Sequence, residues 1–183
     1  VSFPRYVFSG GLALVFMGLL GLHKIKVDVS VASFFKPGTE IRDSMEFMDN
    51  EMSGTMDLRI RVEGDVKDPI ILKNIDSLQS FIEDNDKVTV TYSIANVVKQ
   101  MHRAVMHDSL EYEIIPQDRE KINNLFTMYY MSGDQNDLLS MIDHEHKTSL
   151  ITSLSTAMST EDVFSFVESI TKYIKSHFQG ING

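Results

Sequence analysis

The stretch MDLRIRVEGDVKDPIILKNIDSLQSFIEDNDKVTVTYS, residues 56–93, sets the architecture of this chain. Residues 56–62 alternate between apolar and charged side chains, which is the pattern of a half-buried strand. Asp68 and Pro69 suit the N-cap and the first position of a helix, and apolar residues at helical spacing follow them. Residues 88–92 alternate again and predict a second strand. Together these signals predict a β-α-β unit.

The same alternation predicts which side chains of this unit face the core. On the first strand they are Leu58, Ile60 and Val62, with Asp57, Arg59 and Arg61 on the opposite face. The predicted helix stripe is Ile71, Ile75, Leu78 and Ile82, and the second strand sets Val88, Val90 and Tyr92 against Thr89 and Thr91.

Residues 94–143 predict a helical insertion. Within it, Pro116 is expected to begin a helix and Gly133 to end it, and Asp134 and Asp137 frame a short second helix. The shared apolar face of the longer helix is Ile122, Leu125, Phe126 and Tyr129.

The last part of the chain repeats the strand and helix signals. Residues 147–155 alternate around Leu150, Thr152 and Leu154, and Ser159 with Asp162 then caps a helix. Its predicted stripe is Val163, Val167, Ile170 and Ile174. A fourth strand is expected after Gly180. The predicted fold class is therefore α+β, a ferredoxin-like split β-α-β domain over residues 56–183 with the closing strand missing.

A charge-free run precedes this domain. Residues 6–22 read YVFSGGLALVFMGLLGL and would span roughly 25 Å as a helix, the low end of a bilayer's apolar thickness. We expect a transmembrane helix over residues 5–23, then a linker over 24–55 with a short amphipathic helix at 41–52. A buried core helix is a competing interpretation. A signal peptide is another, since residues 30–32 read Ser-Val-Ala.

Composition excludes several classes of function. The 183-residue chain has a formal net charge of −9 and no cluster of Lys and Arg, which argues against binding nucleic acid. It has no cysteine, so no disulfide, thiol nucleophile or cysteine-based zinc site arises. Phosphate-loop and nucleophile motifs are missing, and Asp84 and Asp86 lie in a polar turn. We expect neither an enzyme nor a bound cofactor.

Asp143-His144-Glu145-His146 is the one cluster with metal-ligating residue types. Alternate residues of a strand point the same way, so His144 and His146 could share a zinc ion. A third ligand at suitable spacing is missing, and His102 and His107 belong to another predicted helix. We therefore expect a solvated turn and no metal site.

Eleven methionines are many for this length. Their flexible, polarizable side chains fill cores or adapt to varied apolar ligands, and we expect most of them to fill the core. One helix carries more apolar surface than a single buried face needs. That surplus, which would line a substrate path or pack against a partner loop, is Phe126, Met128, Tyr129, Tyr130 and Met131.

Three segments carry a resemblance to a known family: FFKPGTEIRDSMEFMDNEMSGT (34–55), TYSIANVVKQMHRAVMHD (91–108) and YEIIPQDREKINNLFTMYYMSGDQNDL (112–138). They resemble the extracytoplasmic loop of predicted exporters of the resistance-nodulation-division (RND) superfamily, of the MmpL-like kind. The shared features are a Ser-Ile-Ala turn after a strand, an Ile-Pro before a helix and a closing Met-Ser-Gly-Asp. The chain departs from the pattern at His144 and His146, where the family tends to have aromatic residues.

The resemblance implies a function that composition alone does not. It implies a multi-pass protein of the inner membrane that uses proton motive force to export hydrophobic or lipid-like substrates, with this domain on the periplasmic side. Its partners would be the bilayer, the remaining helices and second loop of its own transporter, and the substrate. The proton-relaying residues of that family lie in helices that this sequence does not include. The alternative is a single-pass, membrane-anchored binding or assembly domain without transport.

Overall fold

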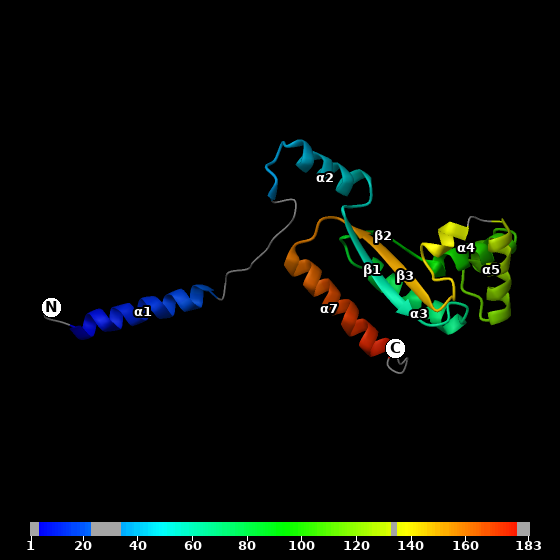
Figure 1. Cartoon of the computed structure of the whole chain (residues 1–183). Helices are drawn as coiled ribbons and strands as arrows, with labels where there is room; N and C mark the ends of the chain where they lie inside the picture. Colours follow the sequence, from blue (N-terminus) through cyan, green and yellow to red (C-terminus); the bar gives the residue numbers. More distant parts are fainter. Residues whose placement is uncertain (1–3, 23–33, 133–134, 179–183) are drawn as a thin grey trace.

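The computed structural model describes residues 4–22, 34–132 and 135–178 (Figure 1). Two helices precede the sheet, namely α1 (Pro4–Leu22) and α2 (Glu40–Glu51). The strands are β1 (Met56–Glu63), β2 (Val88–Ser93) and β3 (Thr148–Ser155), with α3 (Pro69–Glu83) between the first two and α7 (Thr160–His177) after the third. The insertion between β2 and β3 contains α4 (Ile94–Val105), the 3-10 turn η2 (Leu110–Tyr112), α5 (Arg119–Ser132) and α6 (Gln135–Leu139).

The three strands form one antiparallel sheet in the order β1-β3-β2. In its register, Ile60 pairs with Ile151 and Tyr92 pairs with Thr152. Since β1 and β2 both run antiparallel to β3, they run parallel to each other, with α3 connecting them and β3 lying between them. The predicted α+β class and the β-α-β unit are confirmed.

Helices α3 and α7 cover one face of this sheet. Their contact includes the stacked rings of Phe81 and Tyr173, whose centroids lie 4.2 Å apart. Ile75 of α3, Ile151 of β3 and Ile170 of α7 are all buried in the core beneath them. This is the helix-covered face; the other, open face carries the charged side chains of β1, as predicted.

The helical insertion lies at one end of the sheet (Figure 1) and extends the same hydrophobic core. Its fully buried residues include Ile94 and Val98 of α4, Ile122 and Phe126 of α5, and Leu138 of α6. The start predicted for α5 at Pro116 was wrong by three residues. Asp118 ends the preceding loop because its carboxylate accepts the N–H of Glu120 at 2.8 Å. The predicted breaker Gly133 and the capping residue Asp134 lie outside the described residues.

The inward face predicted for β2 was wrong, and β3, for which no inward face was predicted, also turns polar side chains toward the helices. On β2, Thr91 and Ser93 are buried, whereas Val90 and Tyr92 are 39% and 40% exposed on the open face. On β3, the serines at 149, 153 and 155 face the helices, and the leucines at 150 and 154 face the open side. On β2 the polar side chains are tolerated inside because α3 supplies hydrogen-bond partners for Thr91 and Ser93, as described below.

The stripe predicted for the last helix was wrong at one position. Val167 is 42% exposed, and Phe166 is buried instead, beside the correctly predicted Ile170. The cap was predicted correctly, since Ser159 Oγ accepts the N–H of Asp162 at 3.1 Å.

Helix α1 covers residues of the predicted membrane segment and lies apart from the sheet in Figure 1. Its apolar side chains are exposed, including Phe8 (75%), Leu14 (71%) and Met17 (68%). Within the described part of the chain, no helix is both long enough and apolar enough to span a membrane. Helix α2 matches the predicted amphipathic helix and buries none of its residues.

Candidate functional site

An apolar pocket of about 330 Å³ lies between β1, α3 and α7, and we call it the edge pocket. Its lining is formed by Ile60, Arg61, Val62, Glu63, Ile71, Asn74, Ile75, Leu78, Ile174 and Phe178. Val62 and Glu63 end β1, and Phe178 is the C-cap of α7, so the pocket brings the ends of these two elements together. Most of its lining residues are aliphatic or aromatic, which suits apolar side chains or an apolar ligand; Arg61, Glu63 and Asn74 are the polar ones.

A second pocket of about 320 Å³, the methionine pocket, lies between α2, the start of β1 and the start of α7. Three of its lining residues are Met45, Met56 and Met158; the others are Thr55, Ala157, Thr160, Val163 and Phe164. The N–H of Met158 lies 3.1 Å from the Met56 sulfur. Thioether side chains give this wall flexible and polarizable atoms, which accommodate apolar molecules of different shapes.

Asp49 holds α2 against this pocket. Its carboxylate accepts the Thr55 hydroxyl at 2.7 Å and the N–H of Ala157 at 3.2 Å. Gly54, with a φ of 108°, lets the chain pass close to Ser155, where any Cβ would overlap the Ser155 carbonyl. These contacts are polar and few, so the apolar face of α2 stays largely uncovered, including Phe47 at 58% exposure.

The prediction that most methionines fill the core was wrong. Met158 is buried in the core, and Met45 and Met56 are half-buried in the methionine pocket. Others remain on the surface, namely Met17, Met48, Met52, Met128 and Met131.

The cluster Asp143–His146 forms a hydrogen-bonded turn that leads into β3. The Asp143 carboxylate accepts the N–H groups of Lys147 at 2.7 Å and Thr148 at 2.9 Å. These backbone donors, that of Thr148 first, lower the pKa of Asp143. His144 is exposed and His146 is half-buried, so the two imidazoles do not share an environment. Among the described residues, no group of three or more metal-ligating side chains converges.

His146 instead packs into the helical insertion. Its Nε2 lies 2.7 Å from the Tyr130 hydroxyl, and its ring meets that of Phe126 edge-on, with centroids 5.6 Å apart. Burial is the main cause that lowers the pKa of His146, and the nearby Lys67 adds to it. Burial likewise raises the pKa of Tyr130. Sequence spacing gave no signal of this contact, because 16 residues separate the two partners.

The apolar surplus predicted on α5 is smaller than expected. Phe126 is fully buried, and Tyr129 and Tyr130 are half-buried against the core. Met128 and Met131 are 49% and 83% exposed. The surface that α5 offers to a ligand or partner therefore consists of these two methionines.

The other polar residues considered from the sequence lie in turns, caps and local hydrogen bonds. His102 Nδ1 lies 2.9 Å from the Ile114 carbonyl, and His107 sits in the turn after α4 with a φ of 61°. Asp84 is the C-cap of α3, as expected for a residue in a polar turn. Close to it, Lys87 forms an ion pair of 2.6 Å with Asp162 at the start of α7.

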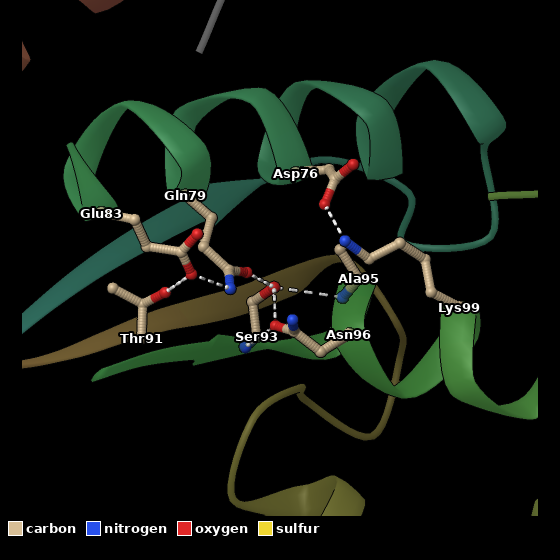
Figure 2. Close-up of polar contacts among 8 residues, drawn as sticks. All are labelled: Asp76, Gln79, Glu83, Thr91, Ser93, Ala95, Asn96 and Lys99. Atoms are coloured by element: carbon tan, nitrogen blue, oxygen red, sulfur yellow. Dashed lines mark hydrogen bonds and ion pairs between the residues drawn. The ribbon is translucent and has the colours of Figure 1, made fainter. Parts of the chain in front are cut away.

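A polar network between α3 and β2 was not predicted (Figure 2). Gln79 is buried; its amide nitrogen donates to Glu83 at 3.0 Å, and its carbonyl accepts the Ser93 hydroxyl at 2.6 Å. The Thr91 hydroxyl donates to the same Glu83 carboxylate. Figure 2 shows these side chains pointing toward one another from α3 and from β2.

Ser93 also caps α4 within this network. Its Oγ accepts the N–H of Ala95 at 3.2 Å, and its own N–H donates to Asn96 Oδ1 at 3.0 Å, which completes a capping box. An ion pair of 2.6 Å between Asp76 of α3 and Lys99 of α4 joins these two helices (Figure 2). The network satisfies every polar group it buries, which identifies it as a structural joint rather than a site with free functional groups.

Comparisons of the chain with protein-family models, with curated proteins and with solved structures gave no match.

Proposed function

We propose that this chain is the extracytoplasmic domain, with its preceding membrane helix, of an RND-type exporter of hydrophobic or lipid-like substrates. The observation that carries the proposal is the combination of α1, which carries no charge over residues 6–22, with an α+β domain built on β1-α3-β2 around β3. The resemblance of residues 34–55 and 91–138 to MmpL-like loops supports the choice of the RND superfamily. Proton motive force would act through helices outside this sequence, and the domain itself has no catalytic part.

The arrangement of the sheet supports the finer fold assignment. A ferredoxin-like sandwich has two β-α-β units, each with a strand of the other unit between its own two strands. The order β1-β3-β2 with α3 and α7 on one face accounts for three strands and both helices of that pattern.

The membrane assignment rests on residues 6–22 and on the exposure of the side chains of α1. Leu14 and Met17, at 71% and 68% exposure, gain from transfer into lipid. A charge-free run of this length is at the lower limit for a span. Short spans are accommodated by local thinning of the bilayer or by packing against other helices, and the small residues Gly10, Gly11 and Gly18 permit close packing.

The substrate class is supported by the methionine pocket. It opens beside α2, the helix that follows the membrane segment in the chain, and its walls are apolar. In the proposal, an apolar molecule leaving the bilayer meets this pocket first. The exposed methionines of α5 would then contact the partner loop of the same transporter.

Export of a lipophilic dye tests the proposal. Cells that produce the protein from its complete reading frame are loaded with Nile red, and dye release is followed with and without a protonophore. We expect faster release than in cells lacking the gene, and loss of that difference when the protonophore is added. Met56→Glu, which places a charge in the methionine pocket, should slow release, whereas the exposed control Leu110→Glu, outside both pockets, should not.

The alternative function, a single-pass anchored binding or assembly domain, predicts a different outcome. Such a protein would remain in the membrane fraction, but dye release would equal that of cells lacking the gene. The polar, sparse attachment of α2 is compatible with this alternative, since it leaves α2 free to act as an anchor linker.

A further inference from the structure

The outer edge of β1 is an open sheet edge. In the described residues, β1 pairs with β3 on one side and with no strand on the other. Because no strand covers this edge, the helix-facing side chains of β1 are only half-buried, namely Met56, Leu58, Ile60 and Val62. Their neighbour Ile151 on β3 faces the same helices and is fully buried. The core is therefore incomplete on the side of β1 that faces away from β3.

Charges do not block this edge. Natural sheets protect open edges with charged side chains that point inward or project past the edge. Here the charges of β1 lie on the open face and pair within the strand. Arg59 meets Asp57 at 2.7 Å, and Arg61 meets Glu63 at 2.6 Å. The backbone N–H and C=O groups along the edge remain available to a further strand.

The edge pocket lies directly beneath this edge. It is lined by Ile60 and Val62 from β1, by Ile75 from α3, and by Ile174 and Phe178 from α7. A strand beside β1 would direct alternate side chains into this space, because successive side chains of a strand point to opposite faces. The apolar walls require those side chains to be apolar.

The topology specifies which segment supplies that strand. The crossover from β1 through α3 moves along the sheet past β3 to β2. The next helix, α7, follows β3 and covers the same face, and β3 runs opposite to β1. Because about 98% of crossovers between parallel strands share one hand, a crossover from β3 over the same face must move in the opposite direction, past β1. The strand that follows α7 therefore belongs at the free edge of β1 and not at that of β2.

We infer that the outer edge of β1 and the edge pocket form a docking site for an extended strand supplied by the polypeptide that follows Phe178. A strand docked there runs antiparallel to β1 and fills the edge pocket with its inward apolar side chains. The edge pocket is then a place for the protein's own chain, and the methionine pocket is left as the site for an apolar ligand.

Disulfide trapping tests this assignment, because the chain has no cysteine of its own. Residues 1–183 are extended after Gly183 by a six-residue Gly-Ser linker and a nine-residue strand with threonine at odd positions and valine at even ones. A cysteine replaces its central residue. One partner cysteine is added on the open face, either Arg59→Cys on β1 or Tyr92→Cys on β2, both at exposed positions.

In detergent micelles, we expect the intramolecular disulfide to form at least tenfold faster with Arg59→Cys than with Tyr92→Cys. Equal rates, a faster reaction at Tyr92→Cys, or no intramolecular disulfide with either would overturn the assignment. A disulfide between two chains in place of one within a chain would assign the edge to a second copy and would also overturn it.

Hydrogen exchange provides a second measurement. The extension should slow amide exchange in residues 56–63 at least tenfold relative to the unextended chain. A control extension with proline at the even positions cannot donate hydrogen bonds there and should give no slowing. Slowing by the proline extension, or no slowing by the valine extension, would contradict strand docking.

Discussion

The hydroxyl of Tyr130 and Nε2 of His146 lie 2.7 Å apart and join α5 to the turn that precedes β3. Phe126 packs against both rings, at 6.5 Å from Tyr130 and 5.6 Å from His146 between centroids. Tyr130 thereby belongs to the folded core of the insertion rather than to the surface available for a substrate.

Replacing Tyr130 should reduce stability. Tyr130→Ala removes two ring contacts and the hydrogen bond, and we expect a loss of about 1–3 kcal/mol in the free energy of unfolding. Urea unfolding followed by circular dichroism measures it. The matched control is Met131→Ala on the same helix, where 83% exposure predicts a change within about 0.5 kcal/mol. Equal effects of the two substitutions would refute the difference in packing.

His146 should make stability depend on pH near neutrality. Its pKa is lowered in the folded protein, chiefly by burial, so the unfolded chain binds more protons as the pH falls below the usual value of 6.5. The contribution of neutral His146 is thus complete above that pH and is lost as the pH falls toward the lowered pKa. We expect the melting temperature to fall between pH 7.5 and 5.5, and to fall less in His146→Gln. An identical fall in both proteins would mean that His146 does not contribute.

Two buried serines should respond oppositely to the same substitution. Ser93 Oγ bonds to Gln79 and to the N–H of Ala95, so Ser93→Ala leaves both unpaired and should cost about 1–3 kcal/mol. Ser153 Oγ, equally buried, has no hydrogen-bond partner among the described residues. Ser153→Ala should therefore be neutral or stabilising. A loss at Ser153→Ala as large as that at Ser93→Ala would contradict the network of Figure 2.

These serines also show where sequence reasoning succeeded and where it did not. The faces of β1 and the caps at Asp68 and Ser159 were predicted correctly, because alternation and capping depend on neighbours a few residues away. The inward face of β2 was predicted wrongly because the partner of Ser93 is Gln79, which lies on another element. Alternation shows that a strand has two different faces. The apolar face is the buried one only when no neighbouring element offers hydrogen-bond partners to the polar face.

For the candidate sites, too, the sequence predicted local features but not contacts between distant residues. The Asp143–His146 turn was predicted because a turn is local, whereas the Tyr130–His146 contact was not. Neither pocket could be predicted from spacing, since each is assembled from three separate elements.

A charge in α1 should test the membrane assignment. Leu14→Arg places a guanidinium in the middle of the charge-free run and should disfavour membrane insertion by about 2.5–3.5 kcal/mol. Carbonate extraction of cell membranes measures retention of the wild-type and variant proteins, with Leu14→Phe as the apolar control. Release of the wild-type chain into the carbonate supernatant would rule out a spanning helix.

The open edge of β1 should make the isolated domain associate with itself. A fragment of residues 36–183 leaves the N–H and C=O groups of that edge exposed beside the edge pocket, and such edges recruit strands from other molecules. We expect sedimentation to show concentration-dependent oligomers, or thermal unfolding to lack cooperativity. Appending the nine-residue valine–threonine strand should restore a monomer that melts cooperatively, because the edge is then paired within the same molecule. The proline-containing extension has the same length but cannot pair, so it should leave the association unchanged. A monomeric, cooperatively melting fragment without any extension would show that the edge of β1 needs no partner, and the inferred docking of a fourth strand would lose its physical basis.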